Sequence, residues 1–331
     1  MPRVSSAALR STTDSPVWAA SIVDYRSDPA EVVAAVEALQ AQVPAPQVVM
    51  VTVAADDTGE RSETLRRAMG HEPADIRTVS GNPGFSASHN EVLADLFRRE
   101  RPRVDVVVVH NPDLVLGSGA AAALVDAATS RVALCGPVLE LGEQGLGTGR
   151  LDTAGIVWTW DGRHFDAGQG DPLPQGIGDA REVAAVSGAC LAVGRRAYER
   201  IVEASGEFFD VDFIAYREDA ELGFRAGLLG VPSLVVPAAR GLHGRRLRGT
   251  ARGGDAAIDL LGVRNRFLIA FKYGRARPGL GPGPWLRDVV VICAVFLRER
   301  GSLPGLRGAW ALRKVMRAKG RRVLDAAEVR Q

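Results

Sequence analysis

The chain has 331 residues, of which 46% are hydrophobic, and its 41 Lys and Arg residues nearly balance its 39 Asp and Glu residues. This balance gives no support to a nucleic-acid-binding function. The three cysteines, Cys135, Cys190 and Cys293, lie far apart among apolar neighbours and without paired Cys or His residues. Their placement favours a reducing compartment and argues against a zinc site.

The sequence predicts neither a signal peptide nor a membrane-spanning segment. Residues 1–16 lack the apolar core of a signal peptide and are predicted to form a flexible tail. The longest apolar run, residues 289–297, is too short to span a bilayer. A cytoplasmic protein, soluble or peripheral to the membrane, is therefore expected.

The first half of the chain alternates between strand and helix patterns. We predict strands at residues 17–23, 47–53, 76–79, 104–109 and 132–134. Helices are predicted between them: one that starts near Ser27, one at 61–69, one that ends at Phe97 and one at 120–128. The run at 104–109 is almost uniformly apolar, as in parallel strands buried on both faces. The order indicates an α/β domain with a mostly parallel sheet, whose ligands would bind beyond the carboxyl ends of the strands.

Two loops of this half carry candidate binding residues. Asp113 follows the apolar strand in the sequence His110-Asn111-Pro112-Asp113, where a carboxylate could hold a divalent cation and, through it, a diphosphate. A plain Asn-Pro-Asp turn is the alternative. The loop at 81–85, Gly-Asn-Pro-Gly-Phe, precedes a helix whose N-terminus could bind phosphate. Its alternative is an ordinary capped connection.

The stretch at 208–225, FFDVDFIAYREDAELGFR, mixes five carboxylates with large apolar side chains. Such a mixture is typical of a pocket wall, because unpaired buried carboxylates are costly and a solvated acidic run needs no large apolar residues. Helical spacing from Glu218 places Glu218 and Asp219 at a helix N-terminus, where an ionised carboxylate could act as a general base. Ordinary N-terminal helix acids are the alternative.

In order and spacing, the segments NPGFSASHN, VVVVHNPD, VSGACLAVGRRAYE and FFDVDFIAYREDAELGFR, followed by His243, resemble glycosyltransferase family two, in its rhamnosyltransferase-like branch. The resemblance covers about residues 17–273. It implies a GT-A-like, Rossmann-type fold and an inverting, metal-dependent transfer. Mg²⁺ or Mn²⁺ would be bound by Asp113 with His243, and Asp219, paired with Glu218, would deprotonate the acceptor hydroxyl.

The resemblance also implies binding residues for both substrates. Donor-binding positions are Tyr25, Asp56, Asp57, Asn82, Gly84, Phe85, Asn90, Asn111 and Asp113, and acceptor-binding positions are Ser187, Gly188, Ala189 and Asp210. The chain departs from the family at Asp56-Asp57-Thr58, where the family reads Asp-Asn-x-Ser. The Gly-rich segment 142–180 could cover the sugar or the acceptor, or could form a surface hairpin that turns at Asp161-Gly162.

The character of the chain changes after Tyr273. Residues 274–284 read as a hinge-like linker, and 298–322 as a basic amphipathic helical appendage. Its apolar face could lie on anionic lipid, at the inner face of the cell membrane, or pack on the catalytic domain as a helical cap. We therefore expect a tail at 1–16, a glycosyltransferase domain at 17–273, and a linker and helical tail at 274–331.

The expected function is transfer of a sugar from a nucleotide-sugar donor to a hydroxyl of a cell-envelope glycan or lipid-linked acceptor. The resemblance favours dTDP-rhamnose as the donor. Alternatives are transfer from a UDP-sugar such as UDP-galactofuranose, a sugar nucleotidyltransferase, and a non-catalytic nucleotide-sugar-binding module. The Gly-rich, basic signature of nucleotidyltransferases is missing after Val23, where Asp24-Tyr25-Arg26 stands. The expected partners are the nucleotide-sugar donor, the sugar acceptor and an anionic membrane surface contacted by the C-terminal tail. A homodimer is an open alternative, and no binding of nucleic acid is expected.

Overall fold

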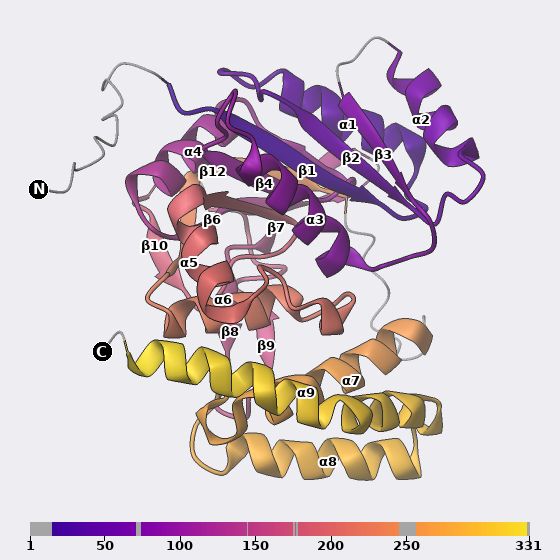
Figure 1. Ribbon diagram of the computed structural model, residues 1–331, viewed down its shortest axis with the longest axis vertical. Coiled ribbons are helices and arrows are strands. Elements are labelled where there is room, and N and C mark those ends of the chain that lie inside the picture. The colour runs from indigo at the N-terminus through magenta and orange to yellow at the C-terminus, as the bar shows by residue number, and fades with distance from the viewer. Residues whose placement is uncertain are drawn as a thin grey trace, which may run out of the picture.

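The computed structural model describes residues 15–70, 74–143, 145–174, 176, 178–244 and 256–329. The predicted tail at 1–16 therefore lies, except for Ser15 and Pro16, outside the described residues. The main sheet has ten strands in the order β10-β12-β6-β11-β4-β1-β2-β3, with β5 paired to β12 and β7 to β6 (Figure 1). β8 and β9 form a separate hairpin.

The bounds of the elements are as follows. The strands are β1 (Trp18–Asp24), β2 (Val49–Ala54), β3 (Ala74–Val79), β4 (Val106–His110), β5 (Leu114–Leu116), β6 (Leu134–Glu143), β7 (Leu146–Thr153), β8 (Ile156–Trp158), β9 (His164–Asp166), β10 (Arg181–Val183), β11 (Cys190–Gly194) and β12 (Ser233–His243). The α-helices are α1 (Pro29–Gln40), α2 (Glu60–Met69), α3 (Phe85–Arg98), α4 (Ala120–Ser130), α5 (Arg195–Ser205), α6 (Glu218–Leu228), α7 (Ala256–Tyr273), α8 (Gly283–Leu297) and α9 (Leu303–Glu328). Short 3-10 turns are η1 (Val211–Phe213), η2 (Gly274–Ala276) and η3 (Arg300–Ser302).

The central strands are parallel and buried on both faces. β1 pairs in parallel with β2 and β4, and β2 with β3. Every residue of β2 and β4 is buried, because helices cover both faces of the sheet. One face packs against α1, α2 and α4, and the other against α3, α5 and α6. The predicted α/β class with a mostly parallel, helix-flanked sheet is confirmed.

The second half of the sheet differs from the prediction in detail. The strand expected at 132–134 begins at Leu134 and continues to Glu143, because the apolar residues up to Leu141 pair with β12. β11 runs antiparallel to both of its neighbours, β4 and β6. In the segment 142–180, β8 and β9 form the surface hairpin considered above, and Gly162 N–H donates to the Thr159 carbonyl in its turn.

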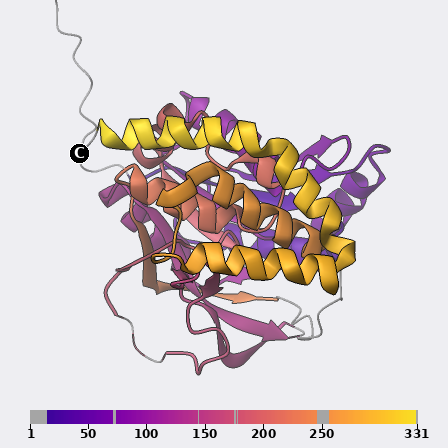
Figure 2. The same cartoon turned by 90° about the horizontal axis from the view of Figure 1, so that it is seen from below.

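The C-terminal helices form a layer beneath the sheet domain, with α7, α8 and α9 side by side (Figures 1 and 2). The apolar face of α9, with Ala309, Met316 and Val323 buried, packs with residues of α7 and α6. The expected appendage is therefore packed on the sheet domain as a cap through this face of α9, and its contact with anionic lipid stays a prediction. The expected hinge at 274–284 is wrong, since Arg277 is buried and Leu280 N–H donates to the Trp160 carbonyl.

A buried ionic network joins this cap to the stretch at 208–225. Lys272 on α7 lies 2.5 Å from Asp210 and 2.7 Å from Glu221. Lys319 on α9 lies 2.6 Å from Asp210, and Arg225 pairs with Glu221 at 3.0 Å. Because these carboxylates are fully buried and opposite charges surround them, their ionised state is stabilised by the cap. The cap and the sheet domain therefore form one packed unit.

Candidate active site

Several predicted site residues meet at one edge of the sheet. β4 and β12 both end there, and β11, antiparallel to β4, begins there with Cys190 opposite His110. β5 turns back along β12 so that Leu114 lies opposite His243. This topology brings Asp113, which follows β4, beside His243, and places the segment Ser187–Ala189 at the same edge.

Asp113, His243 and Asp152 form a contiguous polar cluster. Nε2 of His243 lies 3.3 Å from Oδ1 of Asp113, and Nδ1 lies 2.8 Å from Oδ2 of Asp152. Burial opposes the charged imidazolium, but the hydrogen bonds to the two carboxylates outweigh it and raise the pKa of His243 to about 9. Burial likewise opposes the charge of Asp113, yet the hydrogen bond from His243 lowers the pKa of Asp113. The side chain of Asp113 remains 30% exposed and faces the open edge.

The chemistry of this cluster fits a divalent cation that shares its ligands with a diphosphate. Among the described residues, no group of three or more His, Cys, Asp and Glu side chains is arranged to hold a metal ion by itself. Mg²⁺ in nucleotide-binding sites is commonly held by one or two carboxylates, with water and phosphate oxygens as its other ligands. Asp113 and His243 could serve as the protein ligands, and Asp152 would orient the imidazole.

Asp219 lies at the N-terminus of α6 and is held by backbone N–H groups. Its Oδ2 accepts a hydrogen bond from Gly188 N–H at 3.0 Å, and its Oδ1 accepts one from its neighbour Ala220 at 2.7 Å. A Cβ at Gly188 would lie 3.4 Å from Cβ of Asp219 and 3.5 Å from the Phe85 ring. The three predicted segments that carry Phe85, Gly188 and Asp219 therefore converge.

Glu218 differs from Asp219 in its surroundings. It is buried, and its Oε2 has no hydrogen-bond partner among the described residues. Burial, together with the negative charge of Asp219, raises the pKa of Glu218 to about 8. At neutral pH, Glu218 is therefore mainly protonated, although the sequence assigned the two acids to the same role.

The glycine-rich loop at 81–84 is fixed by contacts on both sides. Asn82 accepts a hydrogen bond from Gly84 N–H at 3.0 Å. Gly84 has φ +89°, and a Cβ there would lie only 2.7 Å from the Ile214 carbonyl oxygen. Asn90 on α3 donates to and accepts from the backbone of Phe209, at 2.7 and 2.8 Å. The amide of Asn90 thus holds the 208–225 stretch against α3, and its donor-binding role stays a prediction.

The residues expected to contact the nucleobase are spread over three strand ends. Tyr25 is 46% exposed just beyond β1, with the Arg26 guanidinium 5.3 Å from its ring centre. Asp57 accepts from Ser80 and from Gly81 N–H, and so ties the ends of β2 and β3 together. Asp56 is buried and accepts from the backbone and hydroxyl of Ser62 at the start of α2. Asp56 thus accepts hydrogen bonds from N–H groups in the first turn of α2, and its donor-binding role stays a prediction.

The remaining acceptor-side predictions divide in the same way. Ser187 is half-buried at the sheet edge, and the predicted donor-side residue Asn111 is half-buried beside it, with its N–H donating to the Ala189 carbonyl at 2.8 Å. Asp210 is fully buried between Lys272 and Lys319. No acceptor can reach its carboxylate in this arrangement, so the acceptor-binding prediction for Asp210 is corrected.

Asp152 was missed by the reasoning from sequence. It lies near the end of β7, and β7 follows β6 in an antiparallel hairpin that brings it back to the sheet edge. The sequence around it, Leu151-Asp152-Thr153, contains no metal-binding spacing. Only the pairing of β6 with both β7 and β12 places Asp152 beside His243.

The fold is that of the GT-A glycosyltransferases. A solved structure of GalNAc-T7 with UDP, GalNAc and Mn²⁺ superposes with a TM-score of 0.56 at 14% identity, covering 78% of this chain and 48% of the other. A mannosyltransferase structure from Pyrobaculum calidifontis, solved with GDP-mannose and Mn²⁺, gives a TM-score of 0.47 at 15% identity, covering 96% of this chain and 87% of the other.

The sequence comparison finds a likeness to a rhamnosyltransferase. The chain is 29% identical over 210 residues to the N-acetylglucosaminyl-diphospho-decaprenol L-rhamnosyltransferase of Mycobacterium tuberculosis, both in strain H37Rv and in strain CDC 1551. The alignment covers 58% of this chain and 66% of the relative, just under two thirds of its length. No protein-family model matches the chain. The resemblance to rhamnosyltransferase-like glycosyltransferases, expected from the motifs, is confirmed.

Proposed function

We propose that the chain is an inverting, metal-dependent glycosyltransferase that moves rhamnose from dTDP-rhamnose to a hydroxyl of a lipid-linked, cell-envelope sugar. The observation that carries the proposal is the convergence of Asp219, backbone-held at the start of α6, with Gly188 and Phe85. The donor and acceptor classes are supported by the name of the mycobacterial relative, a rhamnosyltransferase acting on a diphospho-decaprenol-linked sugar.

Asp219 is proposed as the base. It takes the proton of the acceptor hydroxyl while that oxygen attacks the anomeric carbon of the donor sugar. The bond from the anomeric carbon to the diphosphate breaks, and its electron pair leaves with the nucleoside diphosphate, so the anomeric configuration inverts. Glu218 is less suited to this role because its raised pKa keeps it protonated at neutral pH.

Asp113 and His243 are proposed to hold Mg²⁺ or Mn²⁺ at the donor diphosphate. When bound, such a cation neutralises the charge that develops on the leaving diphosphate. Asp152 fixes the imidazole of His243 by its hydrogen bond at 2.8 Å. Gly84 lets the loop at 81–84 approach the 208–225 stretch closely.

The remaining donor contacts are proposed from the exposed strand ends. Tyr25 would stack on the nucleobase, and Asp57, Asn82 and Asn111 would line the donor side with Phe85. On the acceptor side we propose the Ser187–Ala189 segment. Because the acceptor is lipid-linked, the protein would act at the inner face of the cell membrane. Within the described residues, no helix is long and apolar enough to cross a bilayer.

A product-based assay tests the proposal. Purified protein is incubated with dTDP-rhamnose, UDP-galactofuranose or UDP-galactose and a synthetic N-acetylglucosaminyl-diphospho-prenol, with Mn²⁺ or EDTA, and the lipid product is identified by mass spectrometry. We expect a rhamnosylated product that forms with Mn²⁺ and not with EDTA. Transfer of another sugar would correct the donor, and release of diphosphate from a nucleoside triphosphate and a sugar phosphate would indicate a nucleotidyltransferase. Nucleotide-sugar binding without any product would contradict the assignment as an enzyme.

A further inference from the structure

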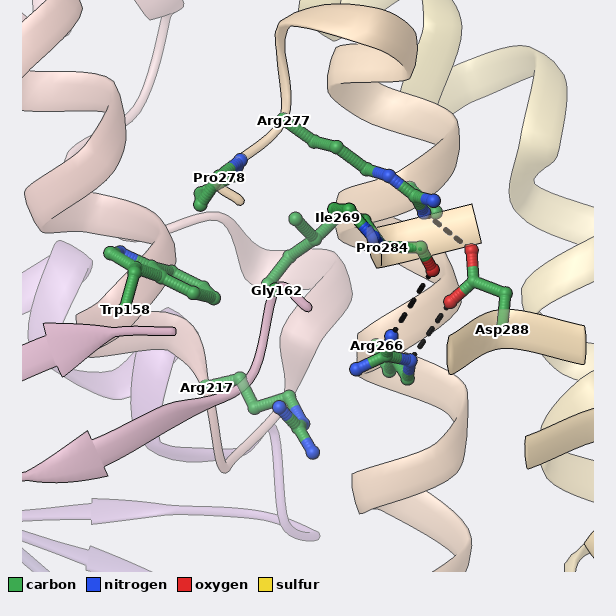
Figure 3. A pocket seen from close by; sticks show the side chains of 10 residues that line it. Trp158, Gly162, Arg217, Arg266, Ile269, Arg277, Pro278, Pro284 and Asp288 are labelled. Atoms are coloured by element: carbon green, nitrogen blue, oxygen red, sulfur yellow. Dashed lines mark hydrogen bonds and ion pairs between the residues drawn. The ribbon is translucent and has the colours of Figure 1, made fainter. Parts of the chain in front are cut away.

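A small hollow lies between the β8–β9 hairpin, the loop before α6, and helices α7 and α8 (Figure 3). Its volume is about 10 Å³, room for one oxygen-sized group. Its lining combines apolar residues with charged ones: Trp158, Gly162, Arg217, Arg266, Ile269, Ala270, Arg277, Pro278, Pro284 and Asp288. The function proposed above assigns no role to it.

The charged lining of the hollow is predominantly cationic. Arg217, Arg266 and Arg277 face one carboxylate among the described lining residues, that of Asp288. Asp288 pairs with Arg266 at 2.8 Å and with Arg277 at 2.5 Å, and so leaves a positive excess. Burial, and then repulsion by Arg266, lowers the pKa of Arg217 to about 10, so the guanidinium remains charged at neutral pH. An anion entering the hollow would relieve this repulsion.

Two donor groups in the hollow are left without partners. Arg277 is only 8% exposed, yet its Nε and Nη2 find no hydrogen-bond acceptor among the described residues. The indole Nε1 of Trp158 is also buried without a partner there. Buried N–H groups are rarely left unpaired, because each costs the free energy of its lost hydration. A multiply charged oxyanion could accept hydrogen bonds from these N–H groups, because they do not already serve another acceptor among the described residues.

The hollow is connected to the proposed active site through Arg217. Arg217 directly precedes Glu218 and Asp219 in the chain, and it projects from that loop toward Arg266 (Figure 3). Its Nη1 lies 3.2 Å from Nδ1 of His164, and its Nε donates to the Gly262 carbonyl at 3.0 Å. An acceptor with its hydroxyl at Asp219 could therefore extend its next group toward these arginines.

The outer face of α8, which is turned away from the hollow-lining Pro284 and Asp288, is apolar and exposed. Its residues Trp285, Leu286, Val289, Val290 and Phe296 are each more than half exposed. Arg277 connects the two features, since its guanidinium lies 4.5 Å from the centre of the Trp285 ring. An anionic group bound by Arg277 would thus be linked to this apolar surface through Trp285, with Arg298 and Arg300 following at the exposed end of α8.

We propose that Arg217, Arg266 and Arg277 bind the diphosphate of a prenyl-diphosphate-linked acceptor, while the exposed face of α8 contacts its prenyl chain in the membrane. An oxygen of the diphosphate enters the hollow and accepts hydrogen bonds from Arg277 Nε and Nη2. The remainder of the diphosphate stays at the mouth, near Arg217. This inference rests on the proposed function for its choice of acceptor, and the guanidinium site itself rests on the geometry.

Geranyl diphosphate is a suitable probe, because it carries the diphosphate and a short prenyl chain without a sugar. Its binding to the full-length protein is measured by calorimetry in EDTA, and the binding of dTDP is measured separately with Mn²⁺. Arg277→Gln is expected to weaken geranyl diphosphate binding about tenfold or more, and to leave dTDP binding unchanged. The matched control is Arg275→Gln, at an exposed arginine two residues earlier, which should bind both ligands like the wild type.

Arg277→Lys keeps a charge for Asp288 but loses the forked N–H groups, so intermediate binding is expected. Arg277→Lys therefore tests the proposal even if Arg277→Gln disturbs the packing of α8. Equal binding of geranyl diphosphate by wild type, Arg277→Gln and Arg277→Lys would overturn the proposal. A parallel loss of dTDP binding would also overturn it, because the arginines would then serve the donor. Because no turnover is measured, these results are independent of whether sugar transfer is observed.

Discussion

Lys319 offers a direct test of whether the C-terminal cap is part of the catalytic unit. Its Nζ lies 2.6 Å from Glu207, 2.6 Å from Asp210 and 2.8 Å from Asp212. Lys319→Met would remove the α9 cation from Asp210, which is fully buried. Deleting one partner of a buried ion pair typically costs about 3–5 kcal/mol. Lys272 would still face Asp210, and the Lys319 side chain is 23% exposed, so we expect the lower end, about 3 kcal/mol.

For chains somewhat smaller than this one, each kcal/mol corresponds to about 2–4 °C in melting temperature, so we expect a decrease of about 6 °C. Differential scanning fluorimetry measures it, with Lys314→Met as the control, because Lys314 lies exposed on the same helix. Transferase activity should fall as well, since the network holds the stretch that leads to Asp219. A melting temperature equal to that of Lys314→Met would refute the reasoning and leave α9 as a detachable tail.

Three further substitutions probe separate parts of the account. Gly84→Ala should cost about 2 kcal/mol or more in unfolding free energy, because its Cβ would lie 2.7 Å from the Ile214 carbonyl oxygen at a φ of +89°; an unchanged urea midpoint would contradict this. Glu218 has a raised folded pKa of about 8 against an ordinary 4.5, so its contribution to stability is lost as pH rises through that window. Glu218→Gln should flatten the wild-type decrease in stability between pH 5 and about pH 8.5, and an unaltered pH profile would speak against it. On α8, Leu286→Glu should reduce sedimentation with anionic liposomes, whereas Leu146→Glu at the likewise exposed Leu146 of β7 should not; equal behaviour of the two would exclude α8 as the contact surface.

The sheet domain was predictable because local patterns dictate it. The buried apolar runs of β1, β2 and β4 and the amphipathic helices between them leave few alternatives to a parallel sheet. Asp113 could likewise be placed at the edge of the sheet, because it directly follows the most apolar strand. Asp219 was placed correctly at a helix N-terminus from the spacing that begins at Glu218.

The misassigned residues depend on contacts that are distant in sequence. Asp210 looks like a ligand-facing acid until Lys272 and Lys319, each more than 60 residues away, are placed beside it. Asp152 reaches His243 only through strand pairing across the sheet. The glycine- and proline-rich sequence at 274–284 suggested flexibility, but Gly279 and Gly283 pack closely against Trp160, where larger residues would not fit. Composition alone cannot distinguish such close packing from a hinge.

Asp219 is the proposed base of the glycosyl transfer. Its most direct test measures Asp219→Asn in two ways on the same preparation: dTDP affinity with Mn²⁺, and the rate of rhamnose transfer to the lipid-linked acceptor. The account predicts unchanged nucleotide affinity and a rate lower by about 10²-fold or more, because the amide cannot take up the hydroxyl proton. Transfer at the wild-type rate would contradict the assignment of Asp219 as the base.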